Sequence, residues 1–130
     1  MNPQDKKIET PHLKLGRLGE ELVAEFLEIT QHQILERNWR CGKAEIDIIA
    51  KTAEGLLLFI EVKTRSTDHF GPGSDSITKR KKKLILDAAV IYCQKYKHLE
   101  DIRFDVANVY INNNDEVIME YLPDAFFDEF

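Results

Sequence analysis

The chain has 130 residues, 43% hydrophobic and 32% charged, with a formal net charge of −5, so it suits one soluble globular domain and is too short for two. Its longest apolar run, Leu56–Ile60, is far below the roughly 20 residues of a membrane-spanning helix, and residues 1–12 hold no apolar signal segment. We therefore expect a single cytoplasmic domain over residues 1–130, and the negative charge by itself argues against nucleic-acid binding.

The first predicted element is an amphipathic helix that follows a polar extension at residues 1–10. Thr10 and Pro11 are typical of a helix start, with Thr10 as the N-cap, and the helix is expected to continue to about residue 31. Its apolar face is predicted from spacings of three and four residues to consist of Leu15, Leu18, Leu22, Phe26 and Ile29.

Three strands are predicted next, over about 33–41, 44–51 and 56–65. Gly42-Lys43 forms the first turn. The second turn, Ala53-Glu54-Gly55, suits a three-residue hairpin loop with glycine in the left-handed position, and such a loop fixes the register of the two flanking strands. The hairpin register can therefore be predicted from local sequence.

A loop is predicted over residues 66–76, and Ser76 is expected to cap a second helix over about 77–97. Cys41 and Cys93 show no metal-ligand spacing, so we expect both to be reduced and structural. The apolar face of the second helix is predicted to consist of Ile77, Leu84, Ile85, Ala88, Ala89 and Tyr92.

Two further strands, at about 102–111 and 116–122, are joined by a turn at 112–115 and precede an acidic, aromatic tail at 123–130. The element order is therefore αβββαββ. This order predicts an α/β fold in which helices flank a central mixed sheet.

The predicted hairpin brings carboxylates together. Its register places Asp47 directly opposite Glu61, and Glu45 opposite Lys63. Opposed side chains have Cβ atoms roughly 5 Å apart, and like charges in that position repel. A divalent cation or a raised pKa of one carboxyl group would relieve the repulsion. The alternative is a solvated face on which Asp47 pairs with Lys63 or Lys43, and a register slip of two residues would favour it.

Glu20 differs from the other acidic residues of the first helix. Arg17, Glu21, Glu25 and Glu28 follow one solvated stripe, whereas the neighbours of Glu20 on the helix surface are small or apolar. Glu20 is therefore expected on or beside the side that packs against the sheet. Buried carboxylates are rare unless they are paired or bind metal, and a boundary residue whose end reaches water is the alternative.

Basic residues are concentrated in the middle of the chain. Residues 37–83 hold eleven basic and six acidic residues, whereas residues 84–130 hold three and ten. Five consecutive cations at the start of the second helix cover every direction around its axis. Lys81 is expected to point from the packing face toward the part of the protein or ligand that lies at the N-terminal end of this helix. A phosphate backbone would satisfy them. The alternative is a solubilising run that pairs with the acidic tail.

Glu20, Asp47, Glu61-Val62-Lys63 and the basic helix, in that order, resemble the PD-(D/E)XK nuclease superfamily. The closer resemblance is to the YraN-like family, small bacterial proteins described as endonucleases and related to archaeal Holliday-junction resolvases. One departure is Ala44, where that family usually has glycine. The resemblance covers Gly16 to about Phe126 and rests on the segments GRLGEELVAEFL, ILERNWR, AEIDIIA, FIEVKTR, SITKRKKKL, RFDV and DAF.

The resemblance implies a restriction-endonuclease-like core and Mg²⁺- or Mn²⁺-dependent hydrolysis of phosphodiester bonds in structured or branched DNA. It implies that Asp47, Glu61 and the Val62 carbonyl hold the metal and that Glu20 completes the shell directly or through water. Lys63 would orient or help deprotonate the attacking water and stabilise charge at phosphorus. The cations implied to contact the nucleic-acid backbone are Arg65, Lys79, Arg80, Lys81, Lys82 and Lys83.

Two other functions are compatible with the sequence. One is a nucleic-acid-binding protein that keeps the nuclease fold without turnover. The other is a protein-interaction module in which Phe126, Phe127 and Phe130 of the acidic tail dock in a partner's groove, unless they fold back as a lid over the core. The sequence leaves open the choice between DNA and RNA, the substrate structure, the pathway and the oligomeric state, with a homodimer among the options.

Overall fold

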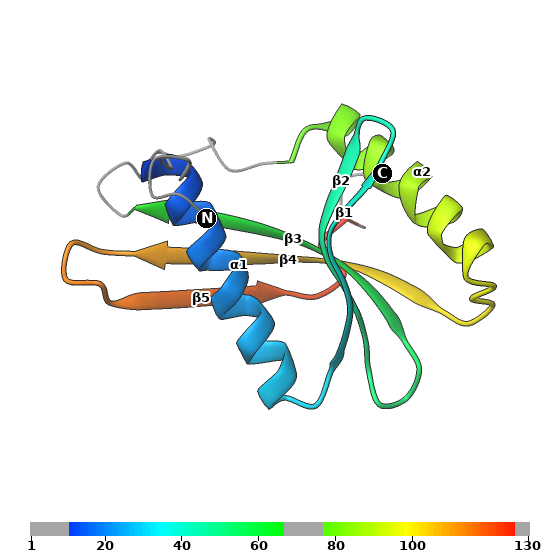
Figure 1. The fold of residues 1–130 in the computed structure, drawn as a ribbon, viewed down its shortest axis with the longest axis horizontal. Helices are drawn as coiled ribbons and strands as arrows, with labels where there is room; N and C mark the ends of the chain where they lie inside the picture. The colour runs from blue at the N-terminus through cyan, green and yellow to red at the C-terminus, as the bar shows by residue number, and fades with distance from the viewer. Residues whose placement is uncertain (1–10, 67–76, 127–130) are drawn as a thin grey trace, which may run out of the picture.

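The computed structural model describes residues 11–66 and 77–126. Five strands form one sheet in the order β1-β2-β3-β4-β5, in which β3 and β4 run parallel and the other neighbours run antiparallel (Figure 1). The predicted αβββαββ fold with a mixed sheet is confirmed. The elements are α1 (Pro11–Ile29), β1 (Gln33–Cys41), β2 (Ala44–Lys51), β3 (Leu57–Ser66), α2 (Lys79–Lys95), β4 (Ile102–Ile111) and β5 (Val117–Leu122).

The two helices pack on separate apolar clusters of the sheet. On the α1 side, Val23, Ala24 and Leu27 pack with residues of β2, β3 and β4, among them the fully buried Ile48 and Ile60. On the α2 side, buried residues of α2 pack with Phe59, Phe126 and other core residues, and the Tyr92 ring lies edge-on to Phe59. Alternate residues of β3 therefore serve different clusters, which is the period of an extended strand.

The β2–β3 hairpin has the register that its turn predicts. Ile48 pairs with Ile60 and Lys51 with Leu57, and Gly55 has a positive φ of 94°. Counted from the turn, the regular pairing ends at Ile48, and Asp47 is the next residue of β2. There the Asp47 carboxylate Oδ2 accepts the Val62 N–H at 2.8 Å, so a side chain replaces the ladder and the strands begin to open at the site.

The predicted apolar face of α1 is right for Leu15 and Leu22, which are partly buried against the core, and wrong for its other three residues. Leu18, Phe26 and Ile29 are 47%, 38% and 81% exposed. The helix instead packs mainly through Val23, Ala24 and Leu27, together with the buried Gly19. Gly19 lies so close to β3 that a Cβ there would stand 1.7 Å from Thr64 Oγ1, and this close approach places the inward stripe between the large side chains. The predicted solvated stripe is confirmed, since its members are exposed: Arg17, Glu21, Glu25 and Glu28.

The start of α2 also differs from its prediction. Thr78, and not Ser76, is the N-cap: its Oγ1 accepts the Lys81 N–H at 3.1 Å, as a hydroxyl at this position commonly does. Ser76 lies outside the described residues, as does most of the predicted loop. The predicted apolar face is confirmed by five buried residues and the partly buried Leu84; the five are Ile77, Ile85, Ala88, Ala89 and Tyr92.

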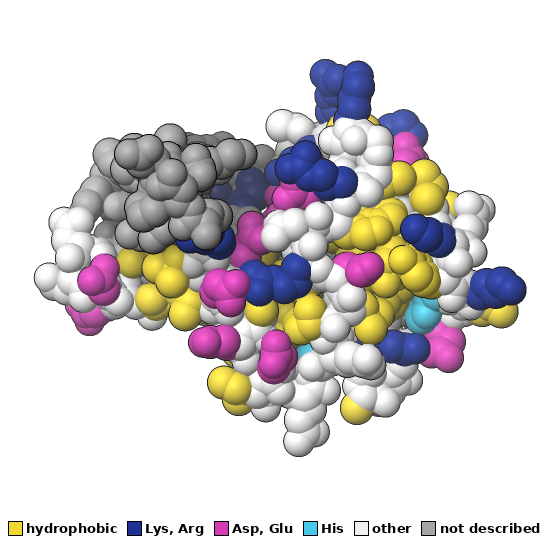
Figure 2. Space-filling view, in the orientation of Figure 1, with side chains coloured by type: hydrophobic (Ala, Val, Ile, Leu, Met, Phe, Trp, Pro, Cys, Tyr) yellow, Lys and Arg dark blue, Asp and Glu magenta, His cyan; other side chains and the backbone are white. Residues whose placement is uncertain are grey.

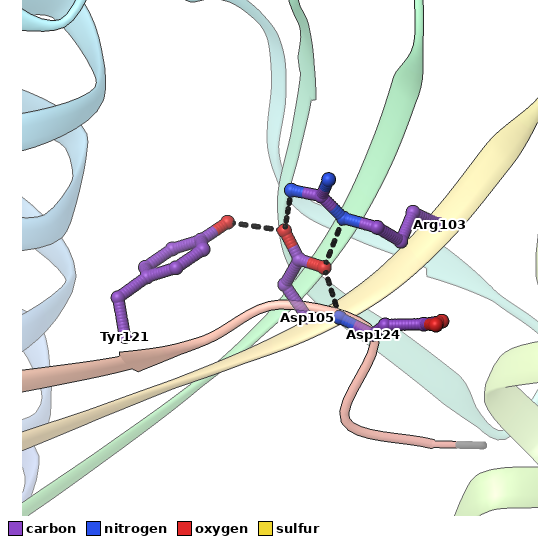
Figure 3. Close-up of polar contacts among 4 residues, drawn as sticks. All are labelled: Arg103, Asp105, Tyr121 and Asp124. Atoms are coloured by element: carbon purple, nitrogen blue, oxygen red, sulfur yellow. Dashed lines mark hydrogen bonds and ion pairs between the residues drawn. The ribbon is translucent and has the colours of Figure 1, made fainter.

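A buried polar cluster ties the segment that follows β5 to β4. Asp105 is 0% exposed. Its carboxylate accepts hydrogen bonds from Arg103 Nε at 2.8 Å and Nη2 at 3.0 Å, from the Tyr121 hydroxyl at 2.5 Å and from the Asp124 N–H at 2.9 Å (Figure 3). Because the charge is paired and hydrogen-bonded, it can be buried. The cluster thereby directs the residues after β5 back across the sheet.

Phe126 then covers the α2 side of the core. Its ring is 3% exposed and stacks on Phe104 with 5.2 Å between centroids, while the Ala125 N–H donates to the Phe104 carbonyl at 2.8 Å. For Phe126 the lid interpretation is therefore confirmed, and Phe127 and Phe130 lie outside the described residues. Cys41 and Cys93 are both free. Among the described helices, neither is long and apolar enough to span a bilayer.

Candidate functional site

Seven of the predicted site residues come together at one cavity of about 440 Å³, bounded by α1, β2, β3 and the start of α2. A second hollow of about 310 Å³ shares Asp47, Glu61 and Lys81 with it and extends toward Lys43 and Glu45. The β2–β3 hairpin supplies the carboxylates of Asp47 and Glu61. The close packing of α1 against β3 brings the Glu20 side chain to the same cavity. The predicted residues that line the larger cavity are Glu20, Asp47, Glu61, Val62, Lys63, Arg65 and Lys81.

Asp47 is the most perturbed carboxyl group of the site. Burial, and then the negative charge of Glu61, raise its pKa from 3.8 to about 8, although the hydrogen bond from the Val62 N–H lowers it. The structural contact of Val62 with the site is thus through its N–H, donated at 2.8 Å. The carboxyl repulsion predicted from the hairpin is present, and it disfavours two negative charges in the absence of a further cation.

Lys81 is the cation closest to these carboxylates. Its Nζ lies 2.5 Å from Glu61 Oε1, and the Glu61 side chain is only 7% exposed whereas that of Lys81 is 48% exposed. Burial opposes the charge of Lys81, but the hydrogen bond and charge of Glu61 outweigh it and raise the pKa of Lys81. Helix α2 therefore contributes directly to the acidic centre, a contact that the sequence does not reveal.

Glu20 lies at the α1 wall of the cavity and is partly buried. Burial raises its pKa, a hydrogen bond with Asn38 and the charge of Arg37 lower it, and Glu45 and Glu61 raise it again. Glu20 thus lies beside the side of α1 that packs against the sheet, and its partial burial fits the boundary residue that was the alternative. Asn38 was missed as its neighbour, because no local spacing relates a β1 residue with a positive φ of 53° to the helix.

Lys63 follows Glu61 on β3 and faces the same cavity. Burial lowers its pKa, and so do the charges of Lys81 and Arg65, against the opposing effect of Glu61 and Asp47. An ammonium group in such surroundings gives up its proton more readily than a lysine in water. The predicted alternative is a solvated face on which Asp47 pairs with Lys63 or Lys43. The structure differs from it, since the Glu61 side chain is buried and its ion pair is with Lys81.

The remaining basic residues of α2 divide into two groups. Lys79, Arg80 and Lys83 are exposed, and Figure 2 shows Lys and Arg side chains gathered at the top of the view, above the place in Figure 1 where α2 begins. Lys82, in contrast, is 2% exposed and its Nζ lies over the Phe126 ring, 5.6 Å from the centroid. The predicted role of Lys82 as a nucleic-acid contact is not supported by this interior position.

The donor chemistry of the site suits a hard divalent cation, which binds carboxylate and carbonyl oxygens. Two facing carboxylates repel each other, and Glu20 lines the same cavity. Over residues 11–66 and 77–126, however, no three His, Cys, Asp or Glu side chains are already gathered as a ligand set. The residues fit a cation by chemistry, and the Lys81 ammonium now contacts one of the expected ligands.

Comparison with known proteins places these residues in a family. The profile of the uncharacterised protein family UPF0102 matches residues 19–109. A UPF0102 protein of Flavobacterium johnsoniae is 40% identical over 120 residues, which are 89% of this chain and 96% of the relative. A UPF0102 protein of Caldicellulosiruptor saccharolyticus is 42% identical over 115 residues, 87% of this chain and 97% of the relative. The chain therefore belongs to the uncharacterised protein family UPF0102.

Proposed function

We propose that this protein is a divalent-metal-dependent endonuclease that hydrolyses phosphodiester bonds of structured or branched DNA. The observation that carries the proposal is the convergence of Glu20, Asp47, Glu61 and Lys63 on one cavity beside the cationic start of α2. The resemblance of these residues to the PD-(D/E)XK nucleases, and among them to the YraN-like family, supports the same chemistry. A fold alone would not, because function is set by the site.

Asp47, Glu61 and the Val62 carbonyl are the groups proposed to hold the metal, with Glu20 completing the shell directly or through water. When bound, Mg²⁺ or Mn²⁺ supplies activation of water and neutralisation of charge on the phosphate oxygens. The Val62 N–H holds Asp47 in place at 2.8 Å. The chain thus fixes one carboxylate by its own backbone before any ligand enters, which favours a defined site.

Lys63 is proposed to orient the attacking water and to donate a hydrogen bond to the negative charge that develops on the phosphate oxygens. Its lowered pKa, caused first by burial, makes proton transfer with water easier. Arg65 lines the same wall of the cavity, where its planar guanidinium suits a phosphate group. The exposed cations Lys79, Arg80 and Lys83 would contact the backbone farther from the cut.

Cleavage assays test the proposal directly. Purified protein is incubated with four-way junctions, flaps, single strands and RNA in Mg²⁺ or Mn²⁺. We expect cleavage of branched DNA that falls by at least about a hundredfold in Glu61→Gln, since one metal ligand is lost. Glu54→Gln, a matched change in the exposed β2–β3 turn, should cut as the unmodified chain does.

Cleavage that is unchanged in Glu61→Gln, or absent on every substrate, contradicts the proposal. Metal-independent, salt-sensitive DNA binding without cleavage would instead identify a binding protein on a nuclease fold. That second function is favoured by one observation, the contact of Lys81 with Glu61, because an ammonium group already neutralises a proposed metal ligand.

A further inference from the structure

Lys81 is anchored at one end and movable at the other. Its backbone N–H is held by the Thr78 side chain at 3.1 Å in the first turn of α2. Its ammonium reaches Glu61 Oε1 at 2.5 Å, and its side chain is 48% exposed. A lysine stem has several rotatable bonds, so the ammonium can leave Glu61 without any change in α2 or in the sheet.

The Lys81 ammonium lies beside the two carboxyl groups, Glu61 and Asp47, that repel each other. Glu61 is 6% exposed and lies near enough to Asp47 to be the largest electrostatic cause that disfavours its ionised form. A buried carboxylate without a partner is costly. In the absence of any other cation, Lys81 is the residue that contacts Glu61 and offsets that cost.

A divalent cation and the ammonium compete for the same oxygen. Both bind carboxylate oxygen at short range, and two positive charges held on one carboxylate repel each other. The divalent ion carries the larger charge and can be bound by several oxygens at once. The ammonium of Lys63 lies in the same cavity and repels the ammonium of Lys81.

We propose that Lys81 is the resident counter-ion of the metal-free site, and that a divalent cation displaces its ammonium from Glu61 toward the cavity in which a phosphate would lie. This inference rests on the proposed function, since it takes Glu61 as a metal ligand. Lys81 is then a positioning residue of the metal-free protein and becomes available to substrate only after the metal has bound. Metal loading and the availability of this cation are thereby coupled.

Metal affinity without nucleic acid tests the exchange. Calorimetric titration with Mn²⁺ is made on the unmodified chain, Lys81→Met, Lys95→Met and Glu61→Gln. We expect Lys81→Met to bind Mn²⁺ about tenfold more tightly, because no ammonium has to be displaced. Lys95→Met, the same change at the far end of α2, should equal the unmodified chain, and Glu61→Gln should bind more weakly.

The outcomes separate the two proposals. Mn²⁺ binding by the unmodified chain with equal or weaker binding by Lys81→Met overturns the counter-ion role and leaves the proposed function standing. An absence of Mn²⁺ binding by the unmodified chain and by Lys81→Met overturns both.

Lysine labelling of the unmodified chain gives a second test that needs no variant. The protein is treated briefly with an acetylating N-hydroxysuccinimide ester, with and without Mg²⁺, and acetylation of each lysine is measured by mass spectrometry. We expect Mg²⁺ to increase the acetylation rate of Lys81 several-fold, because an amino group released from its contact with Glu61 is open to the reagent. Lys95 should be unaffected. A Lys81 rate that is unchanged or reduced by Mg²⁺ overturns the inference.

Discussion

At the scale of single residues, Asp47 connects the fold to the chemistry of the site. Its Oδ2 is bound by the Val62 N–H at 2.8 Å, while burial and Glu61 raise its pKa to about 8. The metal-free protein therefore favours the protonated form of a residue that the proposed function needs in ionised form. A bound cation would remove the reason for that proton, since opposite charge favours the carboxylate.

The raised pKa predicts a pH-dependent stability. Folded Asp47 binds its proton more tightly than the unfolded chain does, so between pH 3.8 and about 8 the contribution of Asp47 to stability falls as pH rises. In metal-free buffer, Asp47→Asn should exceed the unmodified chain by about 2 kcal/mol in unfolding free energy above pH 8 and converge with it toward pH 4. Urea denaturation at several pH values measures this difference. A difference that is constant with pH contradicts the assignment.

Individual site residues were predictable where the relation between them is local. Asp47 and Glu61 belong to one hairpin, and the turn at Gly55 fixes their register. The contact between Lys81 and Glu61 joins α2 to β3, and helix periodicity shows only the direction in which Lys81 points. Lys82 likewise could not be placed from local sequence. A cation in a run of five is expected to be exposed to solvent, and its burial depends on its packing against Phe126.

At the scale of elements, the packing of α1 depends on its smallest residues. Gly19 lies against Thr64, which lets the helix approach β3 and brings Glu20 to the cavity. The buried stripe, Val23, Ala24 and Leu27, lies about one position around the helix from the predicted one. The closest approach of two backbones requires the absence of a side chain, which places Gly19 on the stripe that faces β3. The length of the helix was predicted well: α1 is Pro11–Ile29 and ends two residues before the predicted end.

Two glycines of α1 provide a matched test of this packing. A Cβ at Gly19 would overlap the Thr64 side chain, whereas a Cβ at Gly16 meets nothing within 4 Å. Gly19→Ala should lower the unfolding free energy by about 1–3 kcal/mol through overpacking, and Gly16→Ala should raise it by about 0.5–1 kcal/mol through helix propensity. Thermal and urea unfolding measure both. Thr64→Ala in the Gly19→Ala background should recover part of the loss, and equal effects of the two glycine substitutions would contradict the close approach.

At the scale of the whole molecule, the order of elements and the class of sheet followed from periodicity and turns. The pairing that the sequence does not specify is the parallel one, β3 with β4, because it joins strands separated by α2. This pairing places α2 over the opposite side of the sheet from α1 and directs the N-terminal end of α2 at the carboxylates of β3. The site therefore depends on a long-range crossover, and local patterns could supply its parts without fixing how they meet.

Charge is also arranged at this scale. The chain has a net charge of −5, yet exposed cations gather around the start of α2 beside the cavity, whereas Lys95 and Lys97 lie at the far end of the helix. Association with DNA depends on the local field more than on the net charge. We expect the position of a cation on α2, and not only its sign, to decide its contribution to binding.

Salt dependence of DNA binding tests this expectation. Affinity for a fluorescent four-way junction is measured by anisotropy at several salt concentrations, without divalent metal so that no cleavage occurs. Each phosphate contact contributes about 0.9 to the slope of log affinity against log salt. Neutralising Lys79, Arg80 and Lys83 together to Gln should therefore reduce the magnitude of the slope by about 2 to 3.

The comparison for this variant removes two cations from the other end of the same helix. Lys95→Gln with Lys97→Gln should leave the slope nearly unchanged, because these side chains lie far along α2 from the cavity. If this control lowers the slope as much per charge as the first variant does, binding responds to the general field of the protein, and the start of α2 is not the surface that contacts DNA. A selective loss in the first variant instead places the DNA backbone along the start of α2, next to the cavity that Glu61 and Lys63 line.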